Sequence, residues 1–135
     1  MAFVLVQAGM AAAHLGDAKM ADTMITSMAD NNYYRTYASS HDFGPSIFNA
    51  DISGGMPALM LECLVQSSPL TDENEKIAEY EIRLLPALPA SMKTGKLTSV
   101  HLRGGFTADL EWKDGVLEDW KIENPLHRKY QVIIP

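Results

Sequence analysis

Cysteine is almost missing from the sequence, and the single Cys63 excludes a disulfide within the chain. Positive charge is also scarce, with 11 Lys and Arg against 17 Asp and Glu and a formal net charge of −6. No basic run is longer than the pair Arg128–Lys129, so the chain offers no patch of the kind that neutralises nucleic-acid phosphates. No apolar run approaches the roughly 20 residues of a membrane-spanning helix. We therefore expect neither a nucleic-acid partner nor a membrane span.

Motifs for metal binding and for nucleophilic catalysis are missing as well. His41 and Asp42 are adjacent rather than spaced for ligation, and the sequence contains no His-x-His or Cys-x-x-Cys pair. It also lacks the Gly-x-Ser-x-Gly turn of many serine hydrolases. Cys63 lies in an apolar helical pattern beside Glu62, which favours a buried and unreactive thiol. We expect no metal ion and no cofactor.

Apolar residues are abundant, at 47% of 135 residues, and charged residues make up 21%. This composition is typical of a globular chain, and the length suits one ordinary domain or two small ones that share a core. The opening residues 1–16 lack the basic segment of a signal peptide and indicate instead an amphipathic helix that ends at Gly16. No signal peptide is expected, and the cellular location is left open.

Three apolar or amphipathic segments predict helices at 2–16, 17–30 and 55–67, the first two forming a hairpin. Pro57 is expected in the first turn of the third helix, where its missing N–H costs little. This third helix is apolar nearly all round, so we expect it to be buried on several sides. The intervening residues 31–54, rich in Tyr, Ser, Asn and Gly, form a connection long enough to indicate a function.

The pattern changes after a polar linker at residues 68–76. Strands are expected at 77–88, 97–104, 106–113, 116–124 and 129–135. Several of these segments alternate apolar and polar residues, and Asp114-Gly115 is typical of a hairpin turn. Helices followed by a small antiparallel sheet structure predict an α+β fold in two parts. We place a helical segment at 1–75 and a β-sandwich-like antiparallel domain at 76–135.

The candidate functional residues lie in the connection that precedes the third helix. Asp51, in the stretch FNADISGG, is either a helix cap or turn residue or a catalytic carboxylate. His41 lies among Tyr33, Tyr34 and Tyr37, and such aromatic and polar groups suit the faces and hydroxyls of a sugar. A loop that packs its own aromatic residues is an equal alternative.

Three stretches of the sequence are more specific than these general patterns. They are AAAHLGDAKMAD, FNADISGGMPALMLECLVQS, and IRLLPALP followed by RGGF and EWKDG. Together they resemble the C-terminal end of glycoside hydrolase family 95, a family of inverting α-L-fucosidases and related α-L-galactosidases. The first stretch is similar to a late helical hairpin of the family's barrel of paired helices. The last is similar to the segment that leads from that barrel into a C-terminal β domain.

By this resemblance, Asp51 falls on the family's active-site aspartate, which helps to activate the attacking water. Near Asp51, the residues His41, Tyr37 and Asn49 are candidates for sugar binding. An inverting glycosidase needs a carboxylic acid and a carboxylate base about 6.5–9.5 Å apart, with room for water between them. A turn that leads into a helix provides the rigid backbone that one member of this pair needs.

The sequence departs from the family's pattern at Ile52 and Ser53, where the family has Gly and Asn, and Ile disfavours a left-handed backbone there. In the family, the general acid and an asparagine pair belong to barrel segments that these residues do not include. We therefore expect a C-terminal fragment or truncated homologue of an inverting glycoside hydrolase, inactive alone. The alternative is a non-catalytic carbohydrate-binding or structural module. A homo-oligomer, or association with missing barrel helices, is expected because the third helix needs cover.

Overall fold

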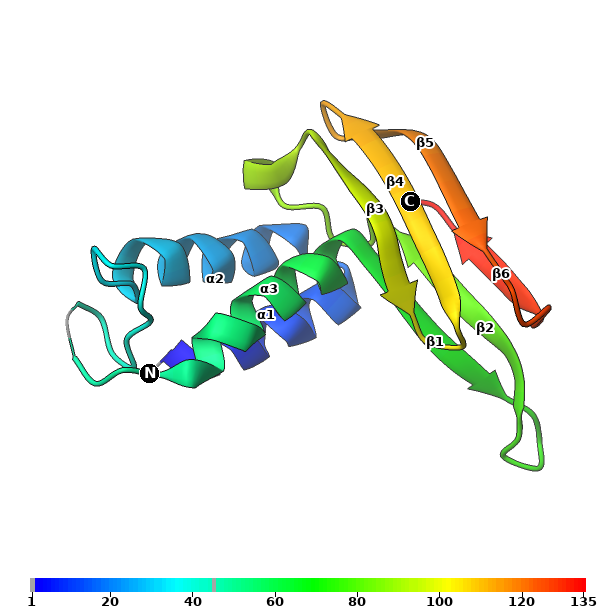
Figure 1. Ribbon diagram of the computed structural model, residues 1–135, viewed down its shortest axis with the longest axis horizontal. Coiled ribbons are helices and arrows are strands. Elements are labelled where there is room, and N and C mark those ends of the chain that lie inside the picture. The colour runs from blue at the N-terminus through cyan, green and yellow to red at the C-terminus, as the bar shows by residue number, and fades with distance from the viewer. Residues whose placement is uncertain (1, 45) are drawn as a thin grey trace.

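The structure is a computed structural model that describes residues 2–44 and 46–135. Over these residues three helices precede six strands and a short 3-10 turn, η1 (Ala90–Met92). The helices are α1 (Ala2–Leu15), α2 (Ala18–Asn31) and α3 (Ala50–Leu64). They pack together at one end of an elongated molecule, and the strands form the other end (Figure 1). The predicted α+β class, with about three helices before the strands, is confirmed. No helix in the described ranges is both long and apolar enough to cross a membrane.

The first two helices form the predicted hairpin. Gly16 makes the turn with a φ of 74°, a left-handed conformation that glycine adopts without strain. Asp17 then caps α2, because its Oδ1 accepts a hydrogen bond from the N–H of Met20 at 2.9 Å. The third helix packs closely on α1, since a Cβ at Gly55 would come within 2.8 Å of the Val6 side chain. Glycine at this position therefore lets the two helices approach each other.

The third helix begins and ends at other residues than predicted. It starts immediately after Asn49 rather than near Gly55, because the Asn49 side chain takes the N-cap position and accepts the N–H of Ile52. Pro57 consequently lies inside the helix and not in its first turn, so the prediction for this proline is wrong. A proline inside a helix removes one hydrogen bond of the helix. The surrounding packing tolerates that loss.

The chain passes from α3 directly into a strand that the sequence pattern did not predict. The strand β1 (Val65–Thr71) replaces the end of the predicted third helix and the start of the predicted polar linker, so both predictions are wrong over these residues. It pairs antiparallel with β2 (Ile77–Leu84), with Val65 opposite Leu84. The segment VQSSPLT is short and largely polar, so its strand conformation depends on hydrogen bonds to β2 rather than on its own propensity.

The strands form two three-stranded sheets. One has the order β1-β2-β6, where β6 is Tyr130–Ile133, and the other has the order β3-β4-β5. The strands of the second sheet are β3 (Gly95–Leu102), β4 (Phe106–Lys113) and β5 (Val116–Glu123). All pairs are antiparallel except β6, which runs parallel to β2. The expectation of a purely antiparallel arrangement is therefore corrected, because the last strand returns to lie parallel beside β2.

Each part of the molecule has its own buried cluster. The helical cluster includes Ile25, Met28, Ile52 and Leu59. The β cluster lies between the two sheets, because inward-facing residues alternate with outward-facing ones along β2 and β4. Its members include Tyr80, Ile82, Leu84, Phe106, Leu110 and Trp112.

Gln66 connects the two parts. Its buried side chain donates hydrogen bonds from Nε2 to the main-chain oxygens of Ala13, at 3.0 Å, and Glu62, at 2.9 Å. Just after β2, the N–H of Ala87 donates to the oxygen of Cys63 at 3.2 Å. The ends of α1 and α3 are thereby joined to the sheets. The division of the chain at residues 75 and 76 stays a prediction.

Candidate functional site

The connection between α2 and α3 is a loop that is ordered by buried polar residues. Two isolated β-bridges, Tyr33 with Ser39 and Ser40 with Phe48, fold the loop back on itself. The buried Asn32 donates a hydrogen bond from Nδ2 to the main-chain oxygen of Ser40 at 3.2 Å. Because buried polar groups need such partners, these contacts specify one conformation of the loop. The loop can therefore present its exposed side chains in fixed positions.

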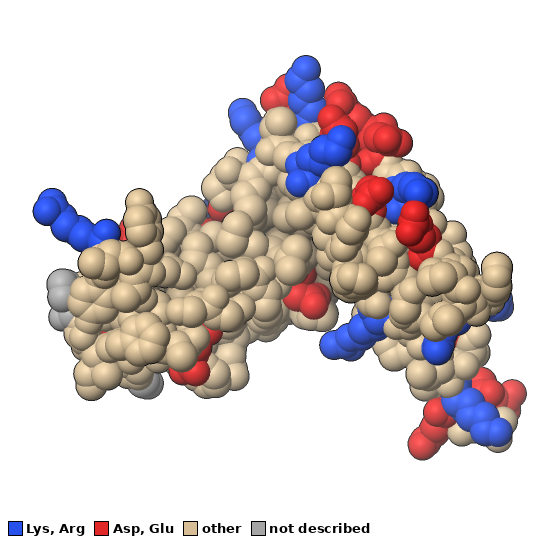
Figure 2. All heavy atoms as spheres, viewed as in Figure 1, with Lys and Arg blue, Asp and Glu red and all other residues tan. Residues whose placement is uncertain are grey.

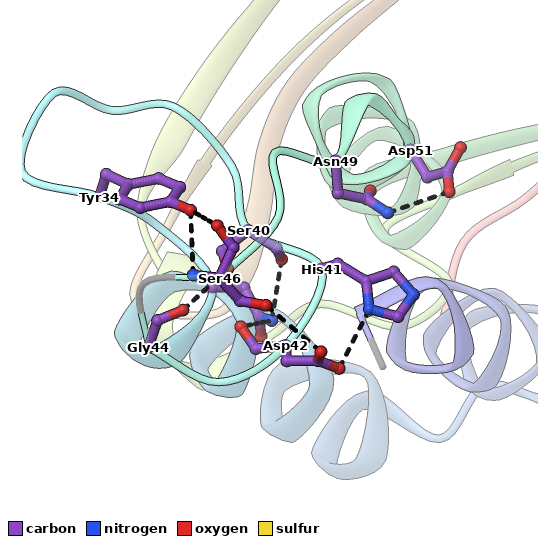
Figure 3. A network of polar contacts seen from close by, with 9 residues as sticks. Tyr34, Ser40, His41, Asp42, Gly44, Ser46, Asn49 and Asp51 are labelled. Atoms are coloured by element: carbon purple, nitrogen blue, oxygen red, sulfur yellow. Dashed lines mark hydrogen bonds and ion pairs between the residues drawn. The ribbon is translucent and has the colours of Figure 1, made fainter.

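Asp51 is exposed in the first turn of α3, but it is not the cap of this helix. Asn49 is the cap, since its Oδ1 accepts the N–H of Ile52 and its Nδ2 donates to Oδ2 of Asp51, each at 3.2 Å. Ser39 fixes Asn49 by donating a hydrogen bond to its main-chain oxygen. The carboxylate lies alongside the Asn49 amide at the start of the helix (Figure 3). This end of the helix carries a partial positive charge that favours an anion.

His41 pairs with its neighbour Asp42 rather than with Asp51. The Nδ1 atom of His41 lies 3.0 Å from Oδ1 of Asp42, and this hydrogen bond holds the pKa of the Asp42 carboxyl below its ordinary value. The oxygen of His41 accepts the N–H of Ala2 at 2.9 Å, which ties the loop to the start of α1. Figure 3 shows the His41 ring turned toward Asp42. No hydrogen bond joins this pair to Asp51 within residues 2–44 and 46–135.

Tyr37 belongs to a different part of the loop. It closes a turn in which its N–H donates to the oxygen of Tyr34 at 2.9 Å, and 88% of its surface is exposed. Its φ is 62°, in the left-handed region that disfavours a residue with a Cβ. Together with Ala29, Tyr33, Tyr34 and Arg35 it lines an open hollow of about 520 Å³. We call this feature the tyrosine hollow.

The structure thus brings together two of the four predicted site residues. Asn49 and Asp51 share a hydrogen bond, His41 is paired with Asp42, and Tyr37 faces the tyrosine hollow. The catalytic role of Asp51 and the sugar-binding roles of the other three remain predictions. The cap at Asn49 was not predicted, although Asn is a favoured N-cap residue. Arg35 was not predicted either, because no motif marks it.

The remaining reactive side chains have ordinary structural roles. Oε2 of Glu62 lies 3.3 Å from Nε2 of His14. Cys63 is buried, as predicted, and burial raises the pKa of its thiol to about 11. In the part of the chain that the structure describes, no group of three or more His, Cys, Asp and Glu side chains is arranged to hold a metal ion.

Charge is distributed unevenly over the molecular surface. Lys, Arg, Asp and Glu side chains gather over the strands in the view of Figure 2, whereas the helical end shows a broad uncharged surface. Several apolar side chains of this end are exposed, among them Phe3, Val4 and Leu15 on α1 and Leu61 on α3. Where exposed apolar side chains form a patch, they often mark a surface that another protein segment covers.

Residues 77–135 match the family model described as glycoside hydrolase family 95, C-terminal domain. The match covers the chain from β2 to β6. It leaves out β1 and the three helices, and with them Asp51 at the start of α3. No curated protein matches the chain.

Proposed function

We propose that this chain, whose residues 77–135 match the family model for the C-terminal domain of glycoside hydrolase family 95, serves in an inverting glycoside hydrolase that acts on α-L-fucosides or α-L-galactosides. In this proposal the β domain braces the helices, and Asp51 helps to activate the water that attacks the sugar. The chain alone is inactive, since the general acid comes from residues outside this sequence.

The position of Asp51 is the observation that carries the proposal. An assisting base must be ionised, exposed to the substrate and held in one orientation. Asp51 is exposed at the positive end of α3, and the Asn49 amide donates to one of its oxygens at 3.2 Å. The other carboxylate oxygen has no hydrogen-bond partner among the described residues. Asp51 therefore offers a free acceptor to a water molecule.

The acidic residues near this position do not suit the role of general acid. A general acid must stay protonated near neutral pH, which requires a raised pKa. Asp42 has the opposite property, because its hydrogen bond with His41 lowers the pKa of its carboxyl. Glu62 is engaged by His14 and lies far along α3 from Asp51. The missing proton donor must come from another segment or another chain.

Ile52 does not disturb the candidate site, although it replaces a glycine of the family's pattern. Ile52 is the third residue of α3, so its backbone is helical. Its side chain is completely buried. No left-handed conformation is required there. Ser53, which replaces an asparagine, lies with its Oγ 2.8 Å from the Oγ of Ser39 and so supports the loop.

A turnover assay with an aryl α-L-fucoside tests the proposal. We expect the purified chain to release no aryl alcohol above the rate in buffer, because half of an acid–base pair does not hydrolyse a glycoside. Turnover by the chain that disappears in Asp51→Asn would show that it contains a complete site, and that the assignment of the acid to other segments is wrong.

The exposed apolar side chains of α1 favour a second function, self-association. Val4 on α1 is 53% exposed. If this surface joins two copies of the chain, Val4→Asp weakens the dimer in sedimentation experiments. Val116→Asp is the matched control, because Val116 is 64% exposed on the β part. A wild-type chain that sediments as a monomer at all concentrations contradicts self-association.

A further inference from the structure

The tyrosine hollow is an open hollow whose lining is mostly aromatic. Its lining consists of Ala29 at the end of α2 and of Tyr33, Tyr34, Arg35 and Tyr37 in the following turn. The volume of about 520 Å³ is in the range of small-molecule sites. Aromatic rings on an open surface provide a face against which the C–H side of a pyranose can pack.

Two of the three tyrosines are fixed through their hydroxyl groups. The hydroxyl of Tyr34 donates to the oxygen of Ser46 and accepts the N–H of the same residue, the latter at 2.9 Å. The hydroxyl of Tyr33 lies 3.5 Å from the sulfur of Met56 on α3. Both rings are thereby held in place before any ligand arrives, which lowers the entropic cost of binding. Figure 3 shows the Tyr34 hydroxyl directed at Ser46.

The third ring, that of Tyr37, is held in solvent at a cost to the fold. A residue with a Cβ is disfavoured at a φ of 62°. Because 88% of the Tyr37 surface is exposed, the ring adds little hydrophobic stabilisation to offset this strain. Glycine or asparagine would suit the turn better. Strained backbone clusters at ligand-binding sites in proteins, and here it holds an exposed aromatic ring at the edge of a hollow.

Arg35 gives the hollow its charge. It is exposed, it is the single charged residue in the lining, and no ion pair engages it in the described part of the chain. A guanidinium group recognises a carboxylate through two parallel hydrogen bonds. The hollow therefore combines an aromatic face for a sugar ring with a free cation for an acidic substituent.

We propose that the tyrosine hollow binds a pyranose that carries a carboxylate, such as a hexuronic acid unit of an oligosaccharide. The sugar ring packs on Tyr37, and its carboxylate pairs with Arg35. This inference rests on the proposed carbohydrate function, but it concerns a site separate from Asp51. In a complete enzyme such a site would hold an acidic unit of the substrate away from the bond that is cleaved.

Saturation-transfer NMR on the intact chain tests the proposal with two matched probes, methyl β-D-glucuronide and methyl β-D-glucoside. We expect saturation of the glucuronide ring protons and at least a fivefold weaker signal for the neutral glucoside. Arg35→Gln should reduce glucuronide affinity about tenfold, since a charge-assisted bidentate contact is lost. Tyr37→Ala should abolish the signal. Two control variants should leave the glucuronide signal unchanged. They are Lys113→Gln, which removes an exposed cation outside the hollow, and Phe43→Ala, which removes an exposed aromatic ring outside it.

A further variant separates binding from folding. Tyr37→Gly removes the ring and also the left-handed strain, so it should lose the glucuronide signal while its thermal midpoint stays equal or rises. Asp51→Asn should bind glucuronide as the wild type does, which keeps this test independent of the proposed catalytic role. Equal binding of both probes, absence of glucuronide binding, or binding that survives Arg35→Gln and Tyr37→Ala would overturn the proposal.

Discussion

Replacing Asn49 by alanine should destabilise the chain by about 2 kcal/mol. The loss of an N-cap side chain costs about 1 kcal/mol by itself. The cost is higher here because Ile52, whose N–H the Asn49 Oδ1 accepts, is completely buried. Its N–H cannot turn to water, and an unpaired buried donor adds on the order of 1 kcal/mol. The hydrogen bond to Asp51 is lost as well, so that the carboxylate is no longer held in one orientation.

Urea unfolding followed by far-UV circular dichroism measures this effect. Asn49→Ser is the matched control, because serine is an equally good cap, and we expect it to stay within about 0.5 kcal/mol of the wild type. Asp51→Ala should cost about 0.3–1 kcal/mol, since it removes only an exposed anion at the helix start. If Asn49→Ala has the midpoint and slope of the wild type, Asn49 does not cap α3 and the description of the candidate site is wrong.

Three further predictions concern the core, the loop and the thiol. Leu59→Ala should cost about 3 kcal/mol in urea unfolding because Leu59 is completely buried, whereas Leu61→Ala on the same helix, at 40% exposure, should cost less than about 1 kcal/mol. The pKa of the Asp42 carboxyl is lower in the folded chain than its ordinary value of 3.8. The ionised carboxylate therefore stabilises the folded chain above pH 3.8, and this stabilisation is lost as the pH falls through the lowered pKa. Asp42→Asn should reduce the fall in thermal midpoint between pH 5 and pH 2, and an unchanged profile would contradict this. Cys63, buried and with its pKa raised to about 11, should react with a thiol reagent only on unfolding, and rapid labelling of the native chain would refute this.

The fold class could be predicted because most segments carry their own periodic pattern. Helix α2 has an apolar face, and the Gly16-Asp17 junction separates it from the apolar α1. In β4, buried residues alternate with half-buried or exposed ones from end to end. The strand β1 could not be predicted in this way. Its sequence is largely polar, and it is a strand because β2 lies beside it. The parallel return of β6 also depends on a contact between distant residues.

The start of α3 shows a different limit of the sequence pattern. Gly54, Gly55 and Pro57 suggested a late start, because these residues usually lie outside a helix or in its first turn. The Asn49 cap and the burial of Ile52 outweigh their low propensity. Close packing of α3 on α1 also requires the small Gly55, because a Cβ there would collide with Val6. Glycine lowers the helix propensity at this position but lets the two helices approach each other.

The candidate site was predictable in part. The resemblance to the family pointed to Asp51, and the structure adds that Asn49 orients it. The tyrosine hollow was less visible, because the position of Tyr37 and the free guanidinium of Arg35 depend on a turn that no motif encodes. The sequence pattern grouped His41 with the tyrosines and with Asp42, and in the structure its side chain pairs with Asp42.

A titration of the isotope-labelled chain with methyl α-L-fucoside tests the central claim, that the Asn49–Asp51 pair faces a sugar. We expect the side-chain amide signals of Asn49 and the backbone amide signal of Ile52 to shift with increasing sugar, and Asp51→Asn to abolish these shifts. Asp119→Asn, a change of an exposed carboxylate on β5, should leave them unchanged. If these signals do not move, or move equally in Asp51→Asn, the start of α3 is not part of a sugar site.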